Sequence, residues 1–193
     1  MPGVMPGGEH TYMSYDLPWA NSSNTPFRLF KHWVHEGGIS TPFAVRWPEV
    51  TGAGGTVVHS PSHFVDIMAS CIEASGAKYP QHRMDKPTKP LAGESFLAAL
   101  RGSEWSRVQP IVWEHEGNQA LRSGNWKLVR KYNQPWELYN FDEDRTELVD
   151  KSAGESFRMK SMLKQYQQLS ELFEVRDWDT VKEIARAIYP GIV

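Results

Sequence analysis

The sequence has a single cysteine, no long apolar run and no excess of positive charge, and each lack excludes a class of protein. Cys71 cannot form a disulfide within the chain, and one cysteine cannot build a cysteine-rich zinc site. No apolar run approaches the roughly 20 residues that span a bilayer. With a net charge of -2, the chain offers no strongly basic face to neutralise phosphates, so we expect neither a nucleic-acid partner nor a membrane span.

The residues that are present are sufficient for a folded core. The 193 residues suit one domain, or one and a half small ones, and 40% of them are hydrophobic and 12% aromatic. Residues 1–8 are rich in glycine and proline and lack the apolar stretch of a signal peptide. We therefore expect the sequence to continue upstream of its first residue.

Two short segments in the first 50 residues have the pattern of regular structure. Thr25-Pro26 resembles a helix N-cap followed by proline at the first helical position, which predicts a short helix or turn running towards Gly37. Residues 41–47 form a short apolar run that Pro48 closes. This pattern is typical of a buried strand in an α/β sheet.

Apolar residues at helical spacing predict two helices before residue 101. The longer one begins after Ser60-Pro61 and ends at Gly76, and a short helical turn is expected at 96–100. On the apolar stripe of the longer helix, a buried and unreactive thiol is the expected state of the cysteine. That stripe consists of Phe64, Ile67, Met68, Cys71 and Ile72.

After residue 105 the hydrophobic period changes from helical to alternating, which predicts an antiparallel meander. Gly124 lies where a hairpin turn is expected between two of the strands. A final amphipathic helix has its apolar stripe between Met159 and Phe173 and can cover one face of the sheet. The expected strands are residues 111–116, 120–122, 126–130 and 136–141.

These patterns place a boundary near residues 101–108 and give two parts of different fold class. Residues 1–104 have the pattern of an α/β domain. Residues 105–193 have the pattern of a small α+β domain, in which a four-stranded antiparallel sheet packs on a C-terminal helix.

Motifs in a fixed order extend over nearly the whole chain, from about Gly8 to Trp178. In the first, a lysine stands five residues before Glu-Gly-Gly-Ile, and a proline and an apolar segment ending in Trp-Pro follow. Together the motifs resemble the formylglycine-dependent sulfatases, the arylsulfatase family of the alkaline-phosphatase-like superfamily. The first motif comprises Lys31, Glu36, Gly37, Gly38, Ile39, Pro42, Trp47 and Pro48, and the later ones are His63–Met68, Pro90–Phe96, Trp113–Asn118, Trp126–Val129 and Trp136–Phe141.

The resemblance implies a sulfuric ester hydrolase whose substrate is an aryl or carbohydrate sulfate. It assigns residues 1–104 to the C-terminal part of an incomplete alkaline-phosphatase-like α/β catalytic domain. Residues 105–193 correspond to the family's small C-terminal domain. The family also implies calcium as the cofactor and a periplasmic or secreted location.

Two parts of the family's active site are missing from the sequence. No Cys/Ser-x-Pro/Ala-x-Arg motif supplies the formylglycine nucleophile, and neither the Asp-Asp pair nor the Asp-Asn pair that holds calcium occurs. We therefore expect no metal ligands in this chain, no hydrolysis by the chain alone, and the missing N-terminal half as a partner. Two alternatives stay open: a non-catalytic module that binds sulfated glycans, and a half-enzyme completed by a partner chain. Ser40 replaces an arginine of many sulfatases, which indicates a subfamily.

Within the first motif, Lys31 takes the position of the family's sulfate-binding lysine. Its ammonium would offset the charge that develops on sulfate oxygens as the S–O bond breaks. The alternative is a solvated surface lysine, which the fixed spacing to the two glycines disfavours. Gly37 and Gly38 are expected to let the backbone turn, and Glu36 to brace either that turn or Lys31.

Three histidines are candidates for contact with the substrate, and each has a structural alternative. His32 and His35 either donate to sulfate or sugar hydroxyls or pack against Trp33. His115, at the end of the first expected strand of the meander, is either a substrate contact or proton donor near the leaving group, or a satisfied strand-end histidine.

Three residues that precede Lys31 are expected at the rim of the substrate site. They are Asn24, Thr25 and Arg28. For Asn24 and Thr25, the alternative is capping of the helix expected after Pro26.

Overall fold

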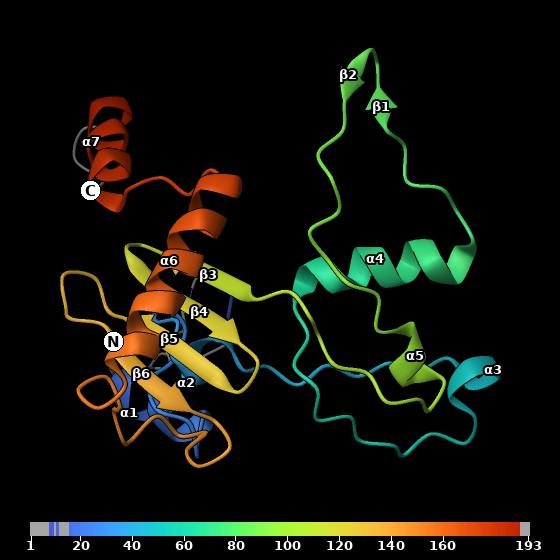
Figure 1. The fold of residues 1–193 in the computed structure, drawn as a ribbon, viewed down its shortest axis with the longest axis horizontal. Helices are drawn as coiled ribbons and strands as arrows, with labels where there is room; N and C mark the ends of the chain where they lie inside the picture. The colour runs from blue at the N-terminus through green and yellow to red at the C-terminus, as the bar shows by residue number, and fades with distance from the viewer. Residues whose placement is uncertain (1–7, 10, 12–15, 190–193) are drawn as a thin grey trace. The chain divides into compact units, whose positions relative to one another are not determined.

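The computed structural model describes residues 8, 9, 11 and 16–189, which fall into two compact units (Figure 1). The sheet unit joins the described residues up to Thr41 with those from Val112 onwards, and the hairpin unit consists of Pro42–Ile111. The sheet unit is therefore built from two stretches that the hairpin unit separates in the sequence. The domain boundaries that the motifs suggest, 1–104 and 105–193, stay a prediction.

Four short strands form the antiparallel meander that the alternating pattern predicts, in the order β3-β4-β5-β6. Strands β4 and β5 pair up to Ser123 and Trp126, across a turn in which Gly124 has a left-handed φ of +58°. The turn between β3 and β4 consists of Glu116 and Gly117, with φ of +52° and +81°, as in a type I′ hairpin. The strands are β3 (Ile111–His115), β4 (Asn118–Ser123), β5 (Trp126–Arg130) and β6 (Glu137–Asn140).

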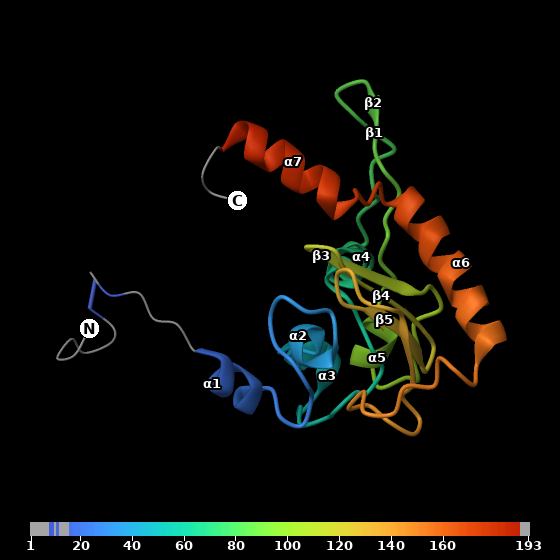
Figure 2. The same ribbon diagram turned by 90° about the vertical axis from the view of Figure 1, so that its left-hand side faces the viewer.

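Alternate residues of these strands point into two cores, so both faces of the sheet are covered (Figure 2). Helix α6 (Ser156–Leu172) packs on one face, which confirms the predicted sheet-on-helix arrangement. The opposite face is covered by Val34 and Ile39, next to helix α2 (Glu36–Ile39). The core under α6 contains Leu121, Leu128, Leu138, Met162 and Tyr166, and the opposite core contains Val34, Ala120, Val129, Tyr139 and Phe141.

Of the short helix or turn predicted from Pro26 towards Gly37, the helix is wrong, and turns occur at residues 24–26 and 31–32. A helix lies before this segment instead, α1 (Asp16–Ser23), and residues 24–35 form a loop. Leu29 and His32 have φ of +67° and +118°, which a right-handed helix cannot contain. The loop is closed by a hydrogen bond of 3.1 Å from the Gly37 N–H to the Arg28 carbonyl.

The hairpin unit contains the two helices that were predicted before residue 101. The longer helix starts with a hydrogen bond of 2.7 Å from the His63 N–H to Asp66 Oδ2, and it ends at Gly76, which has a left-handed φ of +66°. The elements are α3 (Pro48–Thr51), α4 (Phe64–Ser75), β1 (His82–Arg83), β2 (Lys86–Pro87) and α5 (Leu97–Leu100).

The prediction of a buried strand at residues 41–47 is wrong. Nearly all of this segment is exposed, including Phe43 and Val45, and no strand in the described part of the chain pairs with it. An apolar run becomes a strand only where another strand takes up its N–H and C=O groups. That condition depends on the rest of the fold and is not visible in the run itself.

The prediction of a buried Cys71 is also wrong, because α4 buries a different face. The Asp66 carboxylate is fully buried, where it pairs with Arg107 and accepts a hydrogen bond of 2.8 Å from the Glu94 N–H. These contacts turn the polar side of α4 inwards and leave Cys71 exposed. Pairing of a buried charge has therefore outweighed the apolar pattern of the helix.

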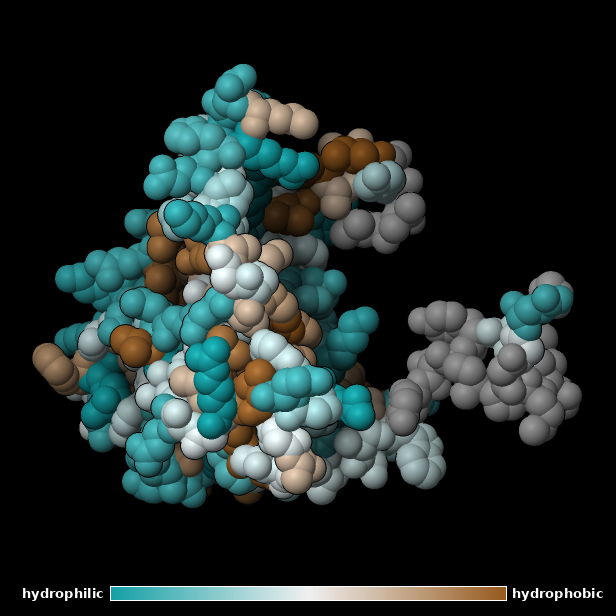
Figure 3. Space-filling view, turned by 90° about the vertical axis from the view of Figure 1, so that its right-hand side faces the viewer, coloured by the Kyte–Doolittle hydropathy of each residue, from teal (hydrophilic) through white to brown (hydrophobic). Residues whose placement is uncertain are grey.

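Hydrophobic side chains also reach the surface elsewhere. On the face shown in Figure 3 they form several separate patches among hydrophilic residues. The last helix, α7 (Trp178–Ile188), exposes Ile184 and Ile188. None of the helices described is both long enough and apolar enough to cross a membrane.

Candidate functional site

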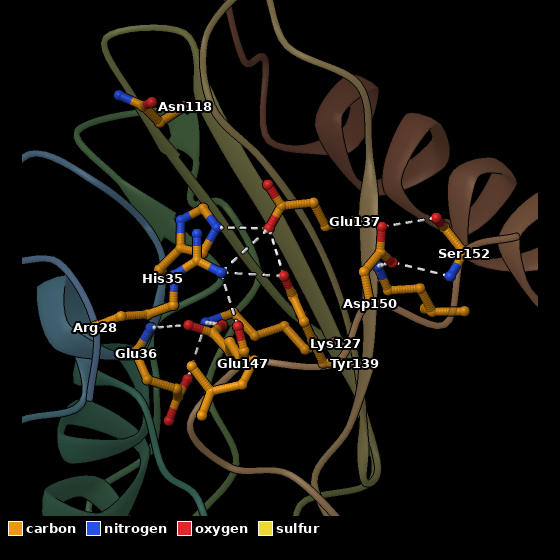
Figure 4. Close-up of polar contacts among 12 residues, drawn as sticks. Arg28, His35, Glu36, Asn118, Lys127, Glu137, Tyr139, Glu147, Asp150 and Ser152 are labelled. Carbon is orange, nitrogen blue, oxygen red and sulfur yellow. Dashed lines mark hydrogen bonds and ion pairs between the residues drawn. The ribbon is translucent and has the colours of Figure 1, made fainter. Parts of the chain in front are cut away.

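A buried group of three charged side chains fixes the turn after Lys31 to the sheet (Figure 4). The Lys127 ammonium in β5 lies 2.9 Å from Glu36 Oε1 and 2.8 Å from Glu147 Oε1. Glu147 Oε2 also accepts a hydrogen bond of 2.8 Å from the Glu36 N–H. All three side chains are at most 4% exposed. Because buried charges must remain paired, this triad holds the start of α2 against β5.

The two glycines after Glu36 are required by close backbone packing. A Cβ atom on Gly37 would lie 2.2 Å from the Leu29 carbonyl oxygen, and one on Gly38 would lie 1.9 Å from the Trp33 carbonyl oxygen. Neither glycine has a left-handed φ, so the dihedral angle is not the reason for glycine here. The absence of side chains lets α2 lie directly on the loop that contains Lys31.

A second polar group connects this loop to β6 (Figure 4). Glu137 Oε2 lies 3.1 Å from His35 Nε2 and accepts a hydrogen bond of 2.6 Å from the Tyr139 hydroxyl. Arg28 Nη1 lies 3.9 Å from the same oxygen and donates a hydrogen bond of 2.7 Å to the Glu147 carbonyl. Arg28 therefore joins the second group to the buried triad.

The environment of Glu137 keeps it ionised. Burial alone would raise the pKa of this carboxyl, but hydrogen bonds from His35 and Tyr139, with the charges of His35 and Arg28, outweigh burial and lower the pKa to about 2. Burial and the hydrogen bond to Glu137 raise the pKa of the Tyr139 hydroxyl. At neutral pH, Glu137 is thus a fixed acceptor of hydrogen bonds and not a proton donor.

A cleft of about 490 Å³ opens within the sheet unit beside the Lys31 loop. Its lining combines aromatic rings, amides and charges of both signs, which suits a ligand with hydroxyl groups and a polar ring. Asn118 links two of its walls, because it donates a hydrogen bond of 3.3 Å to the His32 carbonyl and accepts one of 3.1 Å from the Tyr132 N–H. The lining residues are His32, Trp33, Asn118, Lys131, Tyr132, Gln134, Pro135 and Glu137.

Helix α7 holds one wall of this cleft. The Tyr132 hydroxyl donates a hydrogen bond to Asp179 and accepts one of 2.8 Å from Lys182 Nζ. Lys182 also lies 4.6 Å from the centre of the Tyr132 ring. The ring is therefore positioned by contacts that sequence reasoning did not predict.

The residues expected to bind substrate lie at different depths. Lys31 is exposed, and its ammonium makes no hydrogen bond or ion pair with any residue that the structure describes. His32 lines the cleft. His35 has no exposed surface and Arg28 is half-buried, so both reach the cleft through Glu137.

Asn24 and Thr25 brace the loop before Lys31. Asn24 Nδ2 donates a hydrogen bond of 3.1 Å to the Leu29 carbonyl, and Thr25 Oγ1 donates one of 2.8 Å to the Ser22 carbonyl. The substrate-binding roles of these two residues, and of Lys31, Arg28 and the histidines, stay predictions.

His115 lies at the exposed end of β3, beside the first of the loop histidines. Its ring centre is 5.8 Å from that of His32, and His32 Nδ1 lies 2.8 Å from Glu116 Oε2. Two imidazoles and one carboxylate do not fit calcium, which prefers a shell of oxygen ligands. The described residues thus give no support for a calcium site.

Sequence reasoning missed Lys127, Glu137 and Glu147. The sequence could have indicated the role of Lys127, because this lysine lies within an expected strand between Trp126 and Leu128, where a buried charge needs a partner. No local pattern indicated the roles of Glu147 and Glu137, since their partners Glu36 and His35 are 111 and 102 residues away in the sequence.

Comparison with known proteins agrees with this architecture. Residues 26–174 match the family described as N-sulphoglucosamine sulphohydrolase, C-terminal. An uncharacterized sulfatase of Schizosaccharomyces pombe is 26% identical over 157 residues, which are 74% of this chain and 27% of the relative. An ulvan-active sulfatase of Formosa agariphila is 29% identical over 114 residues, which are 53% of this chain and 21% of the relative. The chain thus spans about a quarter of the length of these curated relatives.

A solved structure supports the fold. The crystal structure of Ps i-CgsB superposes on this chain with a TM-score of 0.64 at 22% identity, over 87% of this chain and 38% of that one. The likeness is to the fold alone at this identity. Because the family match extends over most of the sequence, the chain belongs to the sulfatase family, as a C-terminal region of the N-sulphoglucosamine sulphohydrolase type.

Proposed function

We propose that this chain forms one wall of the active-site cleft of a sulfuric ester hydrolase, and that Lys31 binds the sulfate group. One observation carries the proposal. Buried charges fix the loop around Lys31 to the sheet, while the Lys31 side chain itself remains exposed and has no partner among the described residues. A rigid backbone that presents an unpaired cation suits the binding of an anion.

The proposed role of Lys31 is electrostatic stabilisation of negative charge. Sulfate esters are anionic, and negative charge increases on oxygen as the S–O bond breaks. An ammonium already in place offsets this charge without reorganisation, an effect worth about 3 kcal/mol when one such group is removed. The fixed carboxylate of Glu137 lines the cleft beside the Lys31 loop and would accept hydrogen bonds from substrate hydroxyls.

We propose a sulfated carbohydrate as the substrate class. Trp33 and Tyr132 provide aromatic faces in the cleft, and Asn118 and Gln134 provide amide groups that can donate and accept. A cleft of about 490 Å³ has room for more than a single sulfate ion. One relative is named an ulvan-active sulfatase, and that name supports a polymeric substrate for this chain too.

In this proposal the chain does not hydrolyse esters by itself. The nucleophile motif and the calcium-binding pairs do not occur in its 193 residues, so a further polypeptide must supply them. Either a longer protein or a separate partner chain would do so. Binding without turnover is the second candidate function, and it is favoured by one observation: every residue that lines the cleft belongs to the sheet unit of this chain.

The proposal is tested by binding and by turnover on the same purified chain. Isothermal titration with a sulfated oligosaccharide should give measurable binding that the desulfated form lacks. Lys31→Ala should weaken it about tenfold or more, whereas Lys160→Ala, at an exposed position of α6, should leave it unchanged. Equal binding by the Lys31 variant would refute the role of this lysine.

A turnover assay distinguishes a catalytic function from binding without turnover. With an aryl sulfate and calcium, the chain alone should release no product. Release that depends on calcium would contradict the expectation that the catalytic parts come from elsewhere. Recovery of activity when the N-terminal half of a relative is added would support the half-enzyme over the binding module.

A further inference from the structure

We infer that His32, His115 and Glu116 form a binding site for a divalent transition-metal ion, with zinc as the ion that suits it best. One ring nitrogen of each histidine and one carboxylate oxygen of Glu116 lie within 4.8 Å of one another. Imidazole nitrogen and carboxylate oxygen are ligands that zinc accepts together, at about 2.0–2.2 Å each. The inference does not depend on the role of Lys31.

The three side chains come from two segments that meet only in the folded chain. His32 belongs to the loop before α2, and His115 and Glu116 lie at the end of β3 and in the turn that follows. One pair of donors, His32 Nδ1 and Glu116 Oε2, is 2.8 Å apart. Tetrahedral zinc would need this separation to be roughly 3.3 Å, so the pair opens slightly when an ion replaces the proton between them.

The remaining adjustment is small and lies in mobile parts of the side chains. The side chains of His32 and Glu116 are 43% and 46% exposed, and His115 is exposed at the strand end. The three donors already lie within 4.8 Å of one another, and rotation of an exposed side chain can bring them to the separation of roughly 3.3 Å that tetrahedral zinc needs, without any change in the core. A fourth position would face solvent and hold water, as in zinc sites with three protein ligands.

The backbone at two of the three ligands is held in a conformation that their side chains disfavour. His32 has a φ of +118° and Glu116 a φ of +52°, although a type I′ turn usually takes asparagine, aspartate or glycine at this position. Such strain persists only where the surrounding structure or a ligand compensates for it, and it is frequent at functional sites. The strain adds to the ligand geometry, which carries the inference.

The donor set predicts which ions bind. Two imidazoles favour zinc, nickel and copper over calcium and magnesium, which prefer oxygen ligands. A bound ion would tie the loop of Lys31 to the β3–β4 turn at the edge of the cleft, since His32 lines that cleft. The site would therefore stabilise the fold locally and stiffen one wall of the cleft.

The test is titration of the untagged full chain with Zn²⁺ in a buffer that does not chelate metals. One ion per chain should bind. His32→Ala, His115→Ala and Glu116→Gln should each weaken binding about tenfold or more. His82→Ala removes another exposed histidine, in β1, and should leave binding unchanged. Calcium should not compete for the site.

A second measurement guards against variants that fail to fold. Zn²⁺ should raise the Tm of the wild type and of His82→Ala but not that of His115→Ala. The His115 ring is exposed and belongs to neither core, so its removal should leave the fold intact. Bound Co²⁺ should give visible absorption bands that the same variant lacks. The inference is overturned if the wild type binds no zinc at millimolar concentration, or if the histidine variants bind zinc as the wild type does.

Discussion

At the scale of single residues, the position of the Glu-Gly-Gly turn depends on one buried lysine. Lys127 has no exposed surface and pairs with two glutamates, one in α2 and one in the loop after β6. The sequence resemblance pointed to Lys31 and Glu36 but gave Lys127 only as part of a strand motif. A functional reading of Glu36 is not needed, because its carboxylate is occupied by Lys127.

Replacing Lys127 by methionine should destabilise the sheet unit strongly. The change leaves Glu147 buried without its cation and Glu36 with only Arg145 at 3.9 Å, and breaking a buried charge group in this way typically costs about 3–5 kcal/mol. Unfolding in urea, followed by circular dichroism, measures the loss. Lys160→Met at an exposed position of α6 is the control and should shift the free energy of unfolding by less than about 0.5 kcal/mol. Equal effects of the two changes would contradict the buried triad.

The depressed pKa of Glu137 makes stability depend on pH in a defined direction. Its carboxyl has a pKa of about 2 in the folded chain, against 4.5 as its ordinary value. A group whose pKa is lowered by folding stabilises the protein above its unfolded pKa, and this stabilisation is lost as the pH falls through the folded pKa. The window therefore lies between about pH 4.5 and pH 2.

Glu137→Gln should accordingly destabilise the chain at pH 7. The difference in the free energy of unfolding between the wild type and the variant should decrease progressively towards pH 2. Its full contribution is at most about 3 kcal/mol, and less after solvent screening, because its side chain is 21% exposed. Urea unfolding at a series of pH values gives the difference between the wild type and the variant. A difference that stayed constant from pH 7 to pH 2 would show that the charge of Glu137 is not its source.

At the scale of elements, strands β3 to β6 and helices α4 and α6 could be predicted because their patterns are local, whereas α7 and the β1–β2 hairpin were not predicted. The alternation of strands β3 to β6, the glycine of the β4–β5 turn and the stripe of α6 all lie within short windows of sequence. The failures have a common cause. The strand expected at residues 41–47 needed a partner strand, and the buried face of α4 was decided by the pairing of Asp66 with Arg107, 41 residues away.

The candidate site was predictable in part for the same reason. The motif around Lys31 located the loop. How deeply each side chain of the loop is buried could not be derived from the motif. His35 and Arg28 are turned inwards by Glu137, and His115 meets His32 only because the β3–β4 turn lies beside the loop. Contacts between segments about 100 residues apart leave no periodic trace in the sequence.

Helix α2 itself should be sensitive to any side chain on its glycines. Gly37→Ala and Gly38→Ala each force a Cβ atom to within 2.2 Å and 1.9 Å of a backbone carbonyl oxygen. Backbone must move to relieve this, so each should cost about 3 kcal/mol, at the upper end for overpacking. Thermal unfolding measures the effect. Gly154→Ala is the matched control, since its Cβ would meet nothing nearer than 3.9 Å.

At the scale of the whole molecule, the sheet unit is discontinuous in sequence. Its second core needs Val34 and Ile39 from before the hairpin unit, and its buried triad needs Glu36. Every member of both cores lies outside residues 42–111. A boundary near residues 101–108, placed from the change in period, would separate the sheet from the residues that cover one of its faces.

This arrangement predicts opposite outcomes for two shortened chains. A chain in which a flexible linker replaces residues 42–111 keeps both cores and the triad, so it should unfold cooperatively. Residues 105–193 alone lose Val34, Ile39 and Glu36, which exposes one face of the sheet and leaves Lys127 with one glutamate. Breaking the triad typically costs about 3–5 kcal/mol, and the uncovered apolar side chains add to this. Urea unfolding measures the free energy of unfolding of both chains. If residues 105–193 alone were at least as stable as the chain with the linker, the sheet unit would not need the residues before the hairpin unit.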